Sequence, residues 1–357
     1  MILIISTAHN EGTGAYVMLS EYLTALSPEK RKEYVVVTPM TSLVGTTVKN
    51  LGVEHFPLST NSDTFFSTHI QFKRIMPQLR RPDLVVAWHS RGFDLAVMCA
   101  KKWSCKTVGI IHDHPETPVH GKIRKKIIHW ASKRLDGLIA VSRAVAVPWT
   151  DMYPYKNLEV IHNGLNSGVG YDVGLRKNKN SVVVGFLGGG AKTKGVEIIL
   201  DWIEKSDGMN LEWELYGGGL DKIENDTRII NNKGKERVKI MGRRPRDFIF
   251  SRIDILVHAS TFFDPYPTVI LEAQRAGLPC IGSILGGAVE IIEHGRTGYI
   301  FDPGRPDDGF RYLLSLSENS DIYQELADSA AKSYEQNHTI GKMIEGYERF
   351  FVKTLNL

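Results

Sequence analysis

The sequence has few of the features that would place it in a membrane or in an oxidising compartment. Its three cysteines, Cys99, Cys105 and Cys280, form neither a C-x-x-C pair nor an even-numbered framework, which argues against disulfides and structural zinc. No run approaches the ~18 consecutive apolar residues of a membrane span, and the first five residues, MILII, lack the basic leader of a signal peptide. We therefore expect a cytoplasmic protein with reduced thiols.

The composition is that of an ordinary globular protein. With 42% hydrophobic and 24% charged residues, it excludes disorder, collagen and coiled coil. At ~100–200 residues per domain, 357 residues suggest two domains. The net charge of +4 is uneven, because residues 1–167 hold 20 Lys and Arg against 13 Asp and Glu. The first half is thus expected to meet an anionic partner, nucleic acid or an anionic membrane surface.

Short apolar runs alternate with helix-length segments in both halves of the chain. Runs that are apolar on both faces are typical of parallel strands. They lie at 2–5, 35–37, 84–87, 108–111, 138–141, 182–187, 211–216, 238–241, 255–257 and 279–282. Helices are predicted at 15–26, 69–79, 93–102 and 121–134. The alternation predicts an α/β protein with two Rossmann-like, doubly wound domains.

The boundary between the domains is expected within 165–180, whose Gly, Asn and Lys content is typical of a linker. We place the N-terminal domain at 1–167 and the C-terminal domain at 168–337. A last helix of about 338–357 carries Met343, Tyr347 and Phe350 at helical spacing. Its apolar face must therefore pack against a domain.

A glycine-containing turn follows the first predicted strand. Gly12 and Gly14 match the dinucleotide fingerprint G-x-G-x-x-G only in part, because Val17 replaces the third glycine. The second strand also lacks the acidic residue that binds a ribose, which argues against nicotinamide and flavin cofactors. The turn can still offer backbone N–H groups to a phosphate or sugar. A plain tight turn is the alternative.

A second glycine-rich turn, 188–195, follows the first strand of the second domain. It combines flexible backbone with the ammonium groups of Lys192 and Lys194, which suits a diphosphate. The spacing of its glycines and lysines differs from that of a P-loop. The alternative is a solvated turn.

The most informative stretch lies between residues 264 and 300. It reads DPYPTVILEAQRAGLP over 264–279, GGAVE over 286–290 and GRTGYI over 295–300. This stretch resembles the signature of glycosyltransferase family 4, in which two acidic residues separated by seven precede G-G-x-x-E. Further motifs stand in the order that the family uses: AVS at 140–142, IHNG at 161–164, KG at 194–195, YGGG at 216–219 and MG at 241–242.

The resemblance implies a retaining glycosyltransferase of the GT-B fold, with two Rossmann-like domains facing a central cleft. The first domain would be the acceptor side, with the last helix packed back on it, and the second would bind the nucleotide sugar. The donor would be a UDP- or GDP-linked sugar and the acceptor a glycan or a lipid-linked molecule. The pathway would be the synthesis of cell-surface polysaccharide or lipopolysaccharide. No cofactor and no metal are implied, and the chain has no Asp-x-Asp sequence of the kind that chelates metal in the other main glycosyltransferase fold.

The same resemblance assigns roles to individual residues. Asp264, His112 and Lys194 are the catalytic candidates, with Asp264 bonded to hydroxyls of the donor sugar and His112 facing that sugar. If a helix starts at Thr268, backbone N–H groups there face a diphosphate, and Glu272 one turn later can hold the ribose. The donor-binding candidates are Gly12, Gly14, Gly189, Lys192, Lys194, Gly217, Arg243, Asp264, Thr268, Val269 and Glu272.

Two positions depart from the family pattern. Glycines stand at 188 and 189, where the family has an arginine, so Lys192 is a candidate to replace it. Asp264 stands where the family usually has Glu, one methylene longer. These departures keep open a non-catalytic relative that binds nucleotide sugars. A nucleotide-sugar epimerase of the same fold is a further alternative, because the fold alone does not separate the two reactions.

Two further segments allow more than one interpretation. A metal site is one interpretation of His112, Asp113 and His114, although adjacent residues seldom converge on one ion. For the histidine that faces the sugar, His114 is the second candidate after His112. A core or surface histidine is the plain alternative. The basic helix 121–134 could bind anionic phospholipid at the inner face of the membrane, or it could be a solvated surface helix. No recognition module accompanies the charge, so nucleic acid is not expected as a partner.

Overall fold

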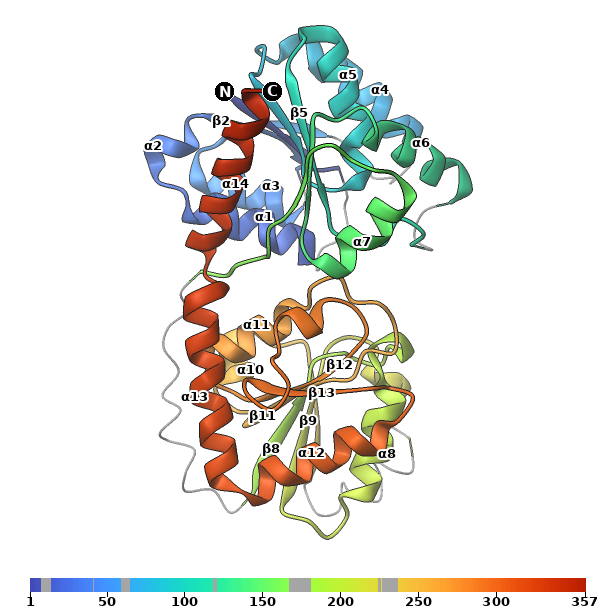
Figure 1. Cartoon of the computed structure of the whole chain (residues 1–357), viewed down its shortest axis with the longest axis vertical. Helices are drawn as coiled ribbons and strands as arrows, with labels where there is room; N and C mark the ends of the chain where they lie inside the picture. Colours follow the sequence, from blue (N-terminus) through green and yellow to red (C-terminus); the bar gives the residue numbers. More distant parts are fainter. Residues whose placement is uncertain are drawn as a thin grey trace. The chain divides into compact units, whose positions relative to one another are not determined.

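The computed structural model describes residues 1–7, 14–40, 42–58, 65–117, 121–166, 181–223, 226 and 237–357. The chain forms two compact units (Figure 1). The first consists of Met1–Asn166 together with Ile340–Leu357, and the second of Ser167–Thr339. Within the described residues, no helix is both long enough and apolar enough to cross a membrane.

The first unit is built on a seven-stranded parallel sheet with the order β3-β2-β1-β4-β5-β6-β7. Its strands are β1 (Ile2–Ile5), β2 (Tyr34–Pro39), β3 (Glu54–Leu58), β4 (Leu84–Ala87), β5 (Lys106–Ile111), β6 (Gly137–Ala140) and β7 (Leu158–Val160). Its helices are α1 (Gly14–Ala25), α2 (Pro28–Arg31), α3 (Leu43–Leu51), α4 (Phe65–Ile75), α5 (Phe93–Trp103), α6 (Lys122–Ser132), α7 (Arg143–Met152) and α14 (Ile340–Leu355), with short 3-10 turns η1 (Met76–Gln78) and η2 (Ser90–Gly92). The chain winds outward from the adjacent strands β1 and β4 in both directions, so these strands mark the switch point of a doubly wound sheet.

The last helix, α14, packs on the first unit (Figure 1). Its buried face carries aromatic side chains. Tyr347 is fully buried, and its ring lies 5.6 Å from that of Tyr22 and 5.7 Å from that of Trp88. Phe350 is also fully buried. Burial of one such side chain is worth ~1.5–3 kcal/mol, so the two together hold the helix on this unit.

The second unit repeats the design with a six-stranded parallel sheet of order β10-β9-β8-β11-β12-β13. Its strands are β8 (Val182–Phe186), β9 (Leu211–Tyr216), β10 (Val238–Gly242), β11 (Ile255–His258), β12 (Cys280–Ser283) and β13 (Gly298–Phe301). Its helices are α8 (Val196–Lys205), α10 (Arg246–Phe250), α11 (Thr268–Arg275), α12 (Pro306–Glu318) and α13 (Ser320–Asn337), with 3-10 turns η4 (Lys192–Lys194), η5 (Leu220–Lys222) and η6 (Gly287–Glu290). Here the switch point lies between β8 and β11.

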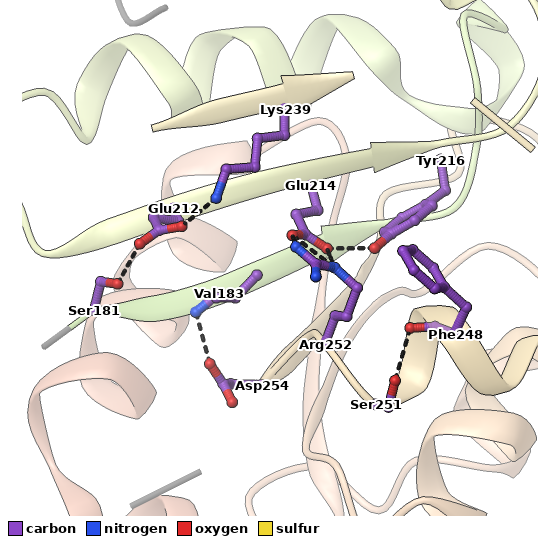
Figure 2. Close-up of polar contacts among 10 residues, drawn as sticks. All are labelled: Ser181, Val183, Glu212, Glu214, Tyr216, Lys239, Phe248, Ser251, Arg252 and Asp254. Atoms are coloured by element: carbon purple, nitrogen blue, oxygen red, sulfur yellow. Dashed lines mark hydrogen bonds and ion pairs between the residues drawn. The ribbon is translucent and has the colours of Figure 1, made fainter. Parts of the chain in front are cut away.

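One part of the second sheet is polar (Figure 2). Glu214 on β9 is 1% exposed, and its carboxylate accepts hydrogen bonds from the Arg252 guanidinium, with Nε at 3.1 Å from each oxygen, and from the Tyr216 hydroxyl. Beside it, Lys239 Nζ lies 3.0 Å from Glu212 Oε2. A cavity of about 420 Å³ borders these residues near the amino ends of β8, β9 and β10. The charged side chains at this cavity are paired with one another, Arg252 with Glu214 and Lys239 with Glu212. The carboxyl edge of the sheet is the end at which doubly wound sheets bind ligands.

Candidate active site

The loops that follow β8 and β11 meet at the carboxyl edge of the second sheet. Ligands of doubly wound sheets bind at such a switch point, outside the carboxyl ends of the strands. Thr261 N donates to Thr193 O at 3.0 Å, which ties the two loops together. Gly195 permits their close approach, because its φ is +81° and a Cβ there would lie 1.8 Å from Ala259 O. The sequence thus needs glycine at this position to bring the loops into contact.

Asp264 and Lys194, both predicted site residues, form an ion pair across these two loops. Lys194 Nζ lies 2.7 Å from Asp264 Oδ2, and His258 Nε2, at the end of β11, lies 3.2 Å from the same oxygen. The side chains of Asp264 and His258 are 14% and 7% exposed, whereas that of Lys194 is 45% exposed. The carboxylate is therefore held by one buried partner and one partner in contact with solvent.

This environment keeps Asp264 ionised. Burial alone would raise the pKa of its carboxyl group, but the hydrogen bond from His258 and the positive charge of Lys194 outweigh burial, and the pKa lies well below its ordinary value. Asp264 is thus a fixed negative charge across the physiological pH range. Such a group can accept hydrogen bonds from sugar hydroxyls.

The backbone of Asp264 is fixed by the loop that follows β12. Its N–H donates to Leu285 O at 3.3 Å, and its carbonyl accepts from Gly287 N at 2.9 Å. Gly286 has φ +100°, and a Cβ there would lie 2.1 Å from Asp264 O. The G-G-x-x-E motif therefore serves, at its first two positions, to position the loop that carries Asp264.

Helix α11 begins at Thr268, as the sequence predicted. The N–H groups of Thr268 and Val269 have no acceptor within the helix, and the positive end of the helix dipole lies there. One turn on, Glu272 is only 6% exposed, which excludes a solvated helix face. Its Oε2 lies 3.1 Å from Arg246 Nε at the start of α10. Cation and helix terminus together favour anionic groups at this edge.

The glycine turn after β8 packs on the turn after β9 rather than lying in solvent. Gly189 N donates to Tyr216 O at 2.8 Å, and Gly217 N donates to Gly242 O at 2.9 Å. These two N–H groups are thus used within the protein. Arg243 extends over this turn, since a Cβ on Gly218 would lie 3.4 Å from its Nε. With the exposed Lys192, Arg243 brings positive charge to this part of the edge.

The described candidates of the first unit, Gly14 and His112, lie at the carboxyl edge of its own sheet. Gly14 is the first residue of α1, and Gly12 falls outside the described residues. His112 follows β5, and burial lowers the pKa of its imidazole to about 4, so the ring is neutral at pH 7. Asp113 Oδ2 accepts from Ser90 Oγ at 3.1 Å. Across the described ranges, no group of three or more His, Cys, Asp or Glu side chains is placed to hold a metal ion.

Two residues of this site were not predicted from the sequence. His258 and Arg246 each contact one member of the acidic pair. A polar residue that ends an otherwise apolar strand was the available signal for His258. For Arg246 it was the basic cluster at 243–246, directly after β10. Neither signal names its carboxylate partner, because both contacts depend on the tertiary fold.

Comparison with solved structures identifies the architecture. HepE of Anabaena, solved in complex with UDP, has a TM-score of 0.84 at 20% identity, covering 99% of both chains. The lipopolysaccharide outer core galactosyltransferase WaaB in its apo form has a TM-score of 0.77 at 16% identity, again covering 99% of each chain. The two doubly wound units therefore define a protein of the GT-B class, as the sequence predicted.

The sequence comparisons give the family. The chain matches Glycosyltransferase Family 4 over residues 20–168 and Glycosyl transferases group 1 over 172–333. The chain therefore belongs to the family 4 glycosyltransferases, as its motifs predicted.

Curated relatives are distant. N-acetyl-alpha-D-glucosaminyl L-malate synthase of Bacillus anthracis is 20% identical over 240 residues, 64% of this chain and 62% of the relative. Spore coat protein SA of Bacillus subtilis is 28% identical over 195 residues, 46% of this chain and 51% of the relative. The match to these two relatives thus spans only about half to three fifths of their length.

Proposed function

We propose that the protein transfers a sugar from a nucleotide diphosphate sugar to a hydroxyl acceptor, with retention of the anomeric configuration. The observation that carries this proposal is the carboxyl edge of the second sheet, where Lys194, Asp264 and the start of α11 meet the requirements of a diphosphate sugar. A UDP-linked donor is supported by the solved structures of HepE with UDP and with UDP-glucose, and a GDP-linked donor is the second possibility.

The reaction breaks the bond between the sugar C1 and a phosphate oxygen and forms a bond between C1 and the acceptor oxygen. The acceptor proton passes to the leaving phosphate. Lys194, aided by Lys192 and the N–H groups of Thr268 and Val269, stabilises the charge of the leaving diphosphate. Glu272 holds the ribose hydroxyls, and Asp264 binds hydroxyls of the transferred sugar.

Incubation with radiolabelled UDP- and GDP-sugars tests the proposal. Slow release of nucleoside diphosphate and free sugar in the absence of acceptor supports a transferase. Formation of an epimer would instead identify a nucleotide-sugar epimerase, and binding without turnover a non-catalytic relative. The matched control is Asp264→Asn, which keeps the shape of the side chain and removes its charge.

We further propose that the reaction needs no divalent metal. Cationic side chains and helix N–H groups neutralise the diphosphate in its place. Turnover should therefore persist in excess EDTA. Loss of activity with EDTA and recovery with magnesium or manganese would contradict this, and would direct attention to His112 and His114.

We propose, third, that the protein associates with the inner face of the cytoplasmic membrane. The pathway would be the synthesis of cell-surface polysaccharide or lipopolysaccharide, with a glycan or a lipid-linked acceptor. The membrane association is supported by the outer face of α6, where Ile123 is 77% and Trp130 41% exposed. Lys122 and Lys126 are exposed beside them, and the Arg134 guanidinium lies 4.3 Å from the Trp130 ring. Cations interleaved with exposed apolar side chains suit an anionic bilayer surface.

Sedimentation with vesicles of phosphatidylglycerol and phosphatidylcholine tests this surface. At ~1 kcal/mol per well-placed cation, Lys122→Glu with Lys126→Glu should weaken binding at least tenfold, and added salt should act in the same direction. Lys332→Glu with Lys342→Glu, the same charge change on exposed positions of α13 and α14, is the control. Equal sedimentation of all three proteins would leave α6 a solvated helix.

A further inference from the structure

We propose that His258 is a positioning residue for the donor site, which fixes one oxygen of the Asp264 carboxylate so that the other oxygen is presented to the donor sugar. The inference rests on the proposed transfer from a nucleotide sugar. Both His258 Nε2 and Lys194 Nζ contact Oδ2, at 3.2 Å and 2.7 Å, and Oδ1 takes part in neither contact. The two partners thus define which oxygen faces the protein.

The ring of His258 is attached to a rigid part of the fold. Strand β11 pairs with β8 on one side and β12 on the other, and His258 lies in register with Gly282. The whole strand is buried. A side chain that leaves such a central strand has little freedom, so it can fix the orientation of a carboxylate on the neighbouring loop.

The hydrogen of this contact belongs to the histidine. An ionised carboxylate only accepts hydrogen bonds, so Nε2 carries the hydrogen and donates it to Oδ2. The other ring nitrogen, Nδ1, is buried and has no hydrogen-bond partner among the described residues. The ring therefore has one polar task in this structure, to hold Asp264.

Lys194 and His258 differ in what happens to them when a donor binds. Lys194 is nearly half exposed and is assigned to the diphosphate in the proposed function, so its contact with Asp264 is exchangeable. His258 is buried and has no diphosphate to serve. When the lysine turns toward phosphate, the histidine remains to keep Asp264 ionised and oriented. This division explains why one carboxylate oxygen has two cationic or N–H partners.

Replacement of His258 should therefore affect turnover and leave nucleotide binding intact. The probe is UDP-glucose, or the sugar nucleotide that supports turnover in the screen above, with UDP as the free nucleotide. For His258→Leu we expect kcat to fall ~10–100-fold, as for the loss of one hydrogen bond to a charged group, and the Kd of UDP to change less than ~3-fold. His258→Gln keeps an N–H donor and should retain activity within ~3-fold.

The pH profile gives a readout that a purely structural role would not change. The titratable side chains on the Asp264 carboxylate are His258 from β11 and Lys194 from η4, while the loop after β12 contributes backbone groups. Loss of the His258 hydrogen bond should raise the pKa of Asp264, so the acid limb of kcat/KM should move to higher pH in His258→Leu. It should not move in His258→Gln.

A double-mutant cycle with Asp264→Asn separates action through Asp264 from any other effect. If His258 acts through Asp264, His258→Leu should cause little further loss in the Asp264→Asn background. Fully multiplied losses, or normal turnover of His258→Leu, would overturn the positioning role while the transferase remains. A folded His258→Gln that binds UDP but loses more than ~10-fold in kcat would also overturn the positioning role. If His258→Leu does not fold, the test rests on this second variant. Absence of turnover with every sugar nucleotide would overturn the proposed function, and the positioning role with it.

Discussion

Replacing each member of the acidic pair by its amide tests whether the two carboxylates have different roles. Glu272 is assigned to the ribose, which does not change during the reaction, so Glu272→Gln should weaken UDP and the sugar nucleotide alike. Asp264 is assigned to the transferred sugar alone. Asp264→Asn should therefore leave the affinity for UDP nearly intact and lower kcat, because the interaction strengthens as charge develops on the sugar.

The size of each effect follows from the surroundings of the two side chains. Both carboxylates are shielded from water, with Glu272 6% exposed and the Asp264 side chain 14% exposed. A hydrogen bond to a charged group contributes about 1.5–3 kcal/mol, which corresponds to roughly 10–150-fold. We expect a change of this size in the Kd of UDP for Glu272→Gln and in kcat for Asp264→Asn. Arg246, the partner of Glu272, is half exposed, so it adds little when its pair is lost.

Calorimetry with UDP and steady-state kinetics with the sugar nucleotide measure the two effects separately. Glu204→Gln, an exposed carboxylate on α8, controls for the loss of a negative charge in the same unit. Asp264→Glu, which keeps the charge and adds a methylene, should preserve activity or change the preferred donor. The assignment is refuted if Asp264→Asn loses affinity for UDP while Glu272→Gln binds it normally.

Four other substitutions test the site and the fold. Lys194→Ala should lower kcat/KM about 10–150-fold. An equal loss in Lys192→Ala would show that both lysines serve the diphosphate. An unchanged kcat/KM in Lys192→Ala would show that Lys192 does not contact the diphosphate. Arg252→Ala should lower the free energy of unfolding in urea by about 2–4 kcal/mol, because Glu214 would lose its cationic partner while buried, and a loss below about 1 kcal/mol would contradict this. The pKa of His112 is about 4 in the folded protein and ~6.5 in the unfolded chain, so the unfolded state binds more protons between these values. The free energy of unfolding should therefore fall, by up to about 3 kcal/mol, as the pH drops from 6.5 to 4. His112→Asn should have a shallower dependence on pH over that window, and melting curves of equal slope would count against the buried neutral ring.

Most of the strands that could be predicted from the sequence lie inside a sheet. All ten apolar runs correspond to strands, and nine of these strands lie between two neighbours, where a parallel strand covered by helical layers needs apolar side chains. The tenth, β10, is an edge strand. The three that were missed, β3, β7 and β13, lie at sheet edges. Their burial is mixed, as in Leu158–Val160, where no residue is fully buried. These three edge strands lack the continuous apolar run that identifies a central strand.

The basic helix shows why periodicity alone left two interpretations open. The sequence predicted a basic helix that binds phospholipid or is solvated; in the structure α6 turns Ile128 and Ala131 inward and leaves Ile123 and Trp130 in solvent. One cation also points inward, because Arg124 Nη2 lies 3.0 Å from the buried carboxylate of Asp94. Which side of such a helix meets the protein is decided by its neighbours on α5. The spacing of its own residues does not contain that information.

The candidate site divides in the same way between local and tertiary information. Lys194 and the helix start at Thr268 could be suggested from the sequence because a glycine-rich turn and a helix start are local properties, whereas Asp264 was named from the resemblance to family 4. The different ionic partners of Asp264 and Glu272 could not be predicted, because these partners are brought together by the fold. Asp264 meets a histidine from the preceding strand and a lysine from the loop after β8, while Glu272 forms an ion pair with the half-exposed Arg246. The carboxylate of Asp264 is therefore fixed beside an exchangeable cation, and that of Glu272 is paired with a residue at the start of a neighbouring helix. This difference in surroundings would let two identical functional groups serve different parts of one substrate, the transferred sugar and the unchanging ribose.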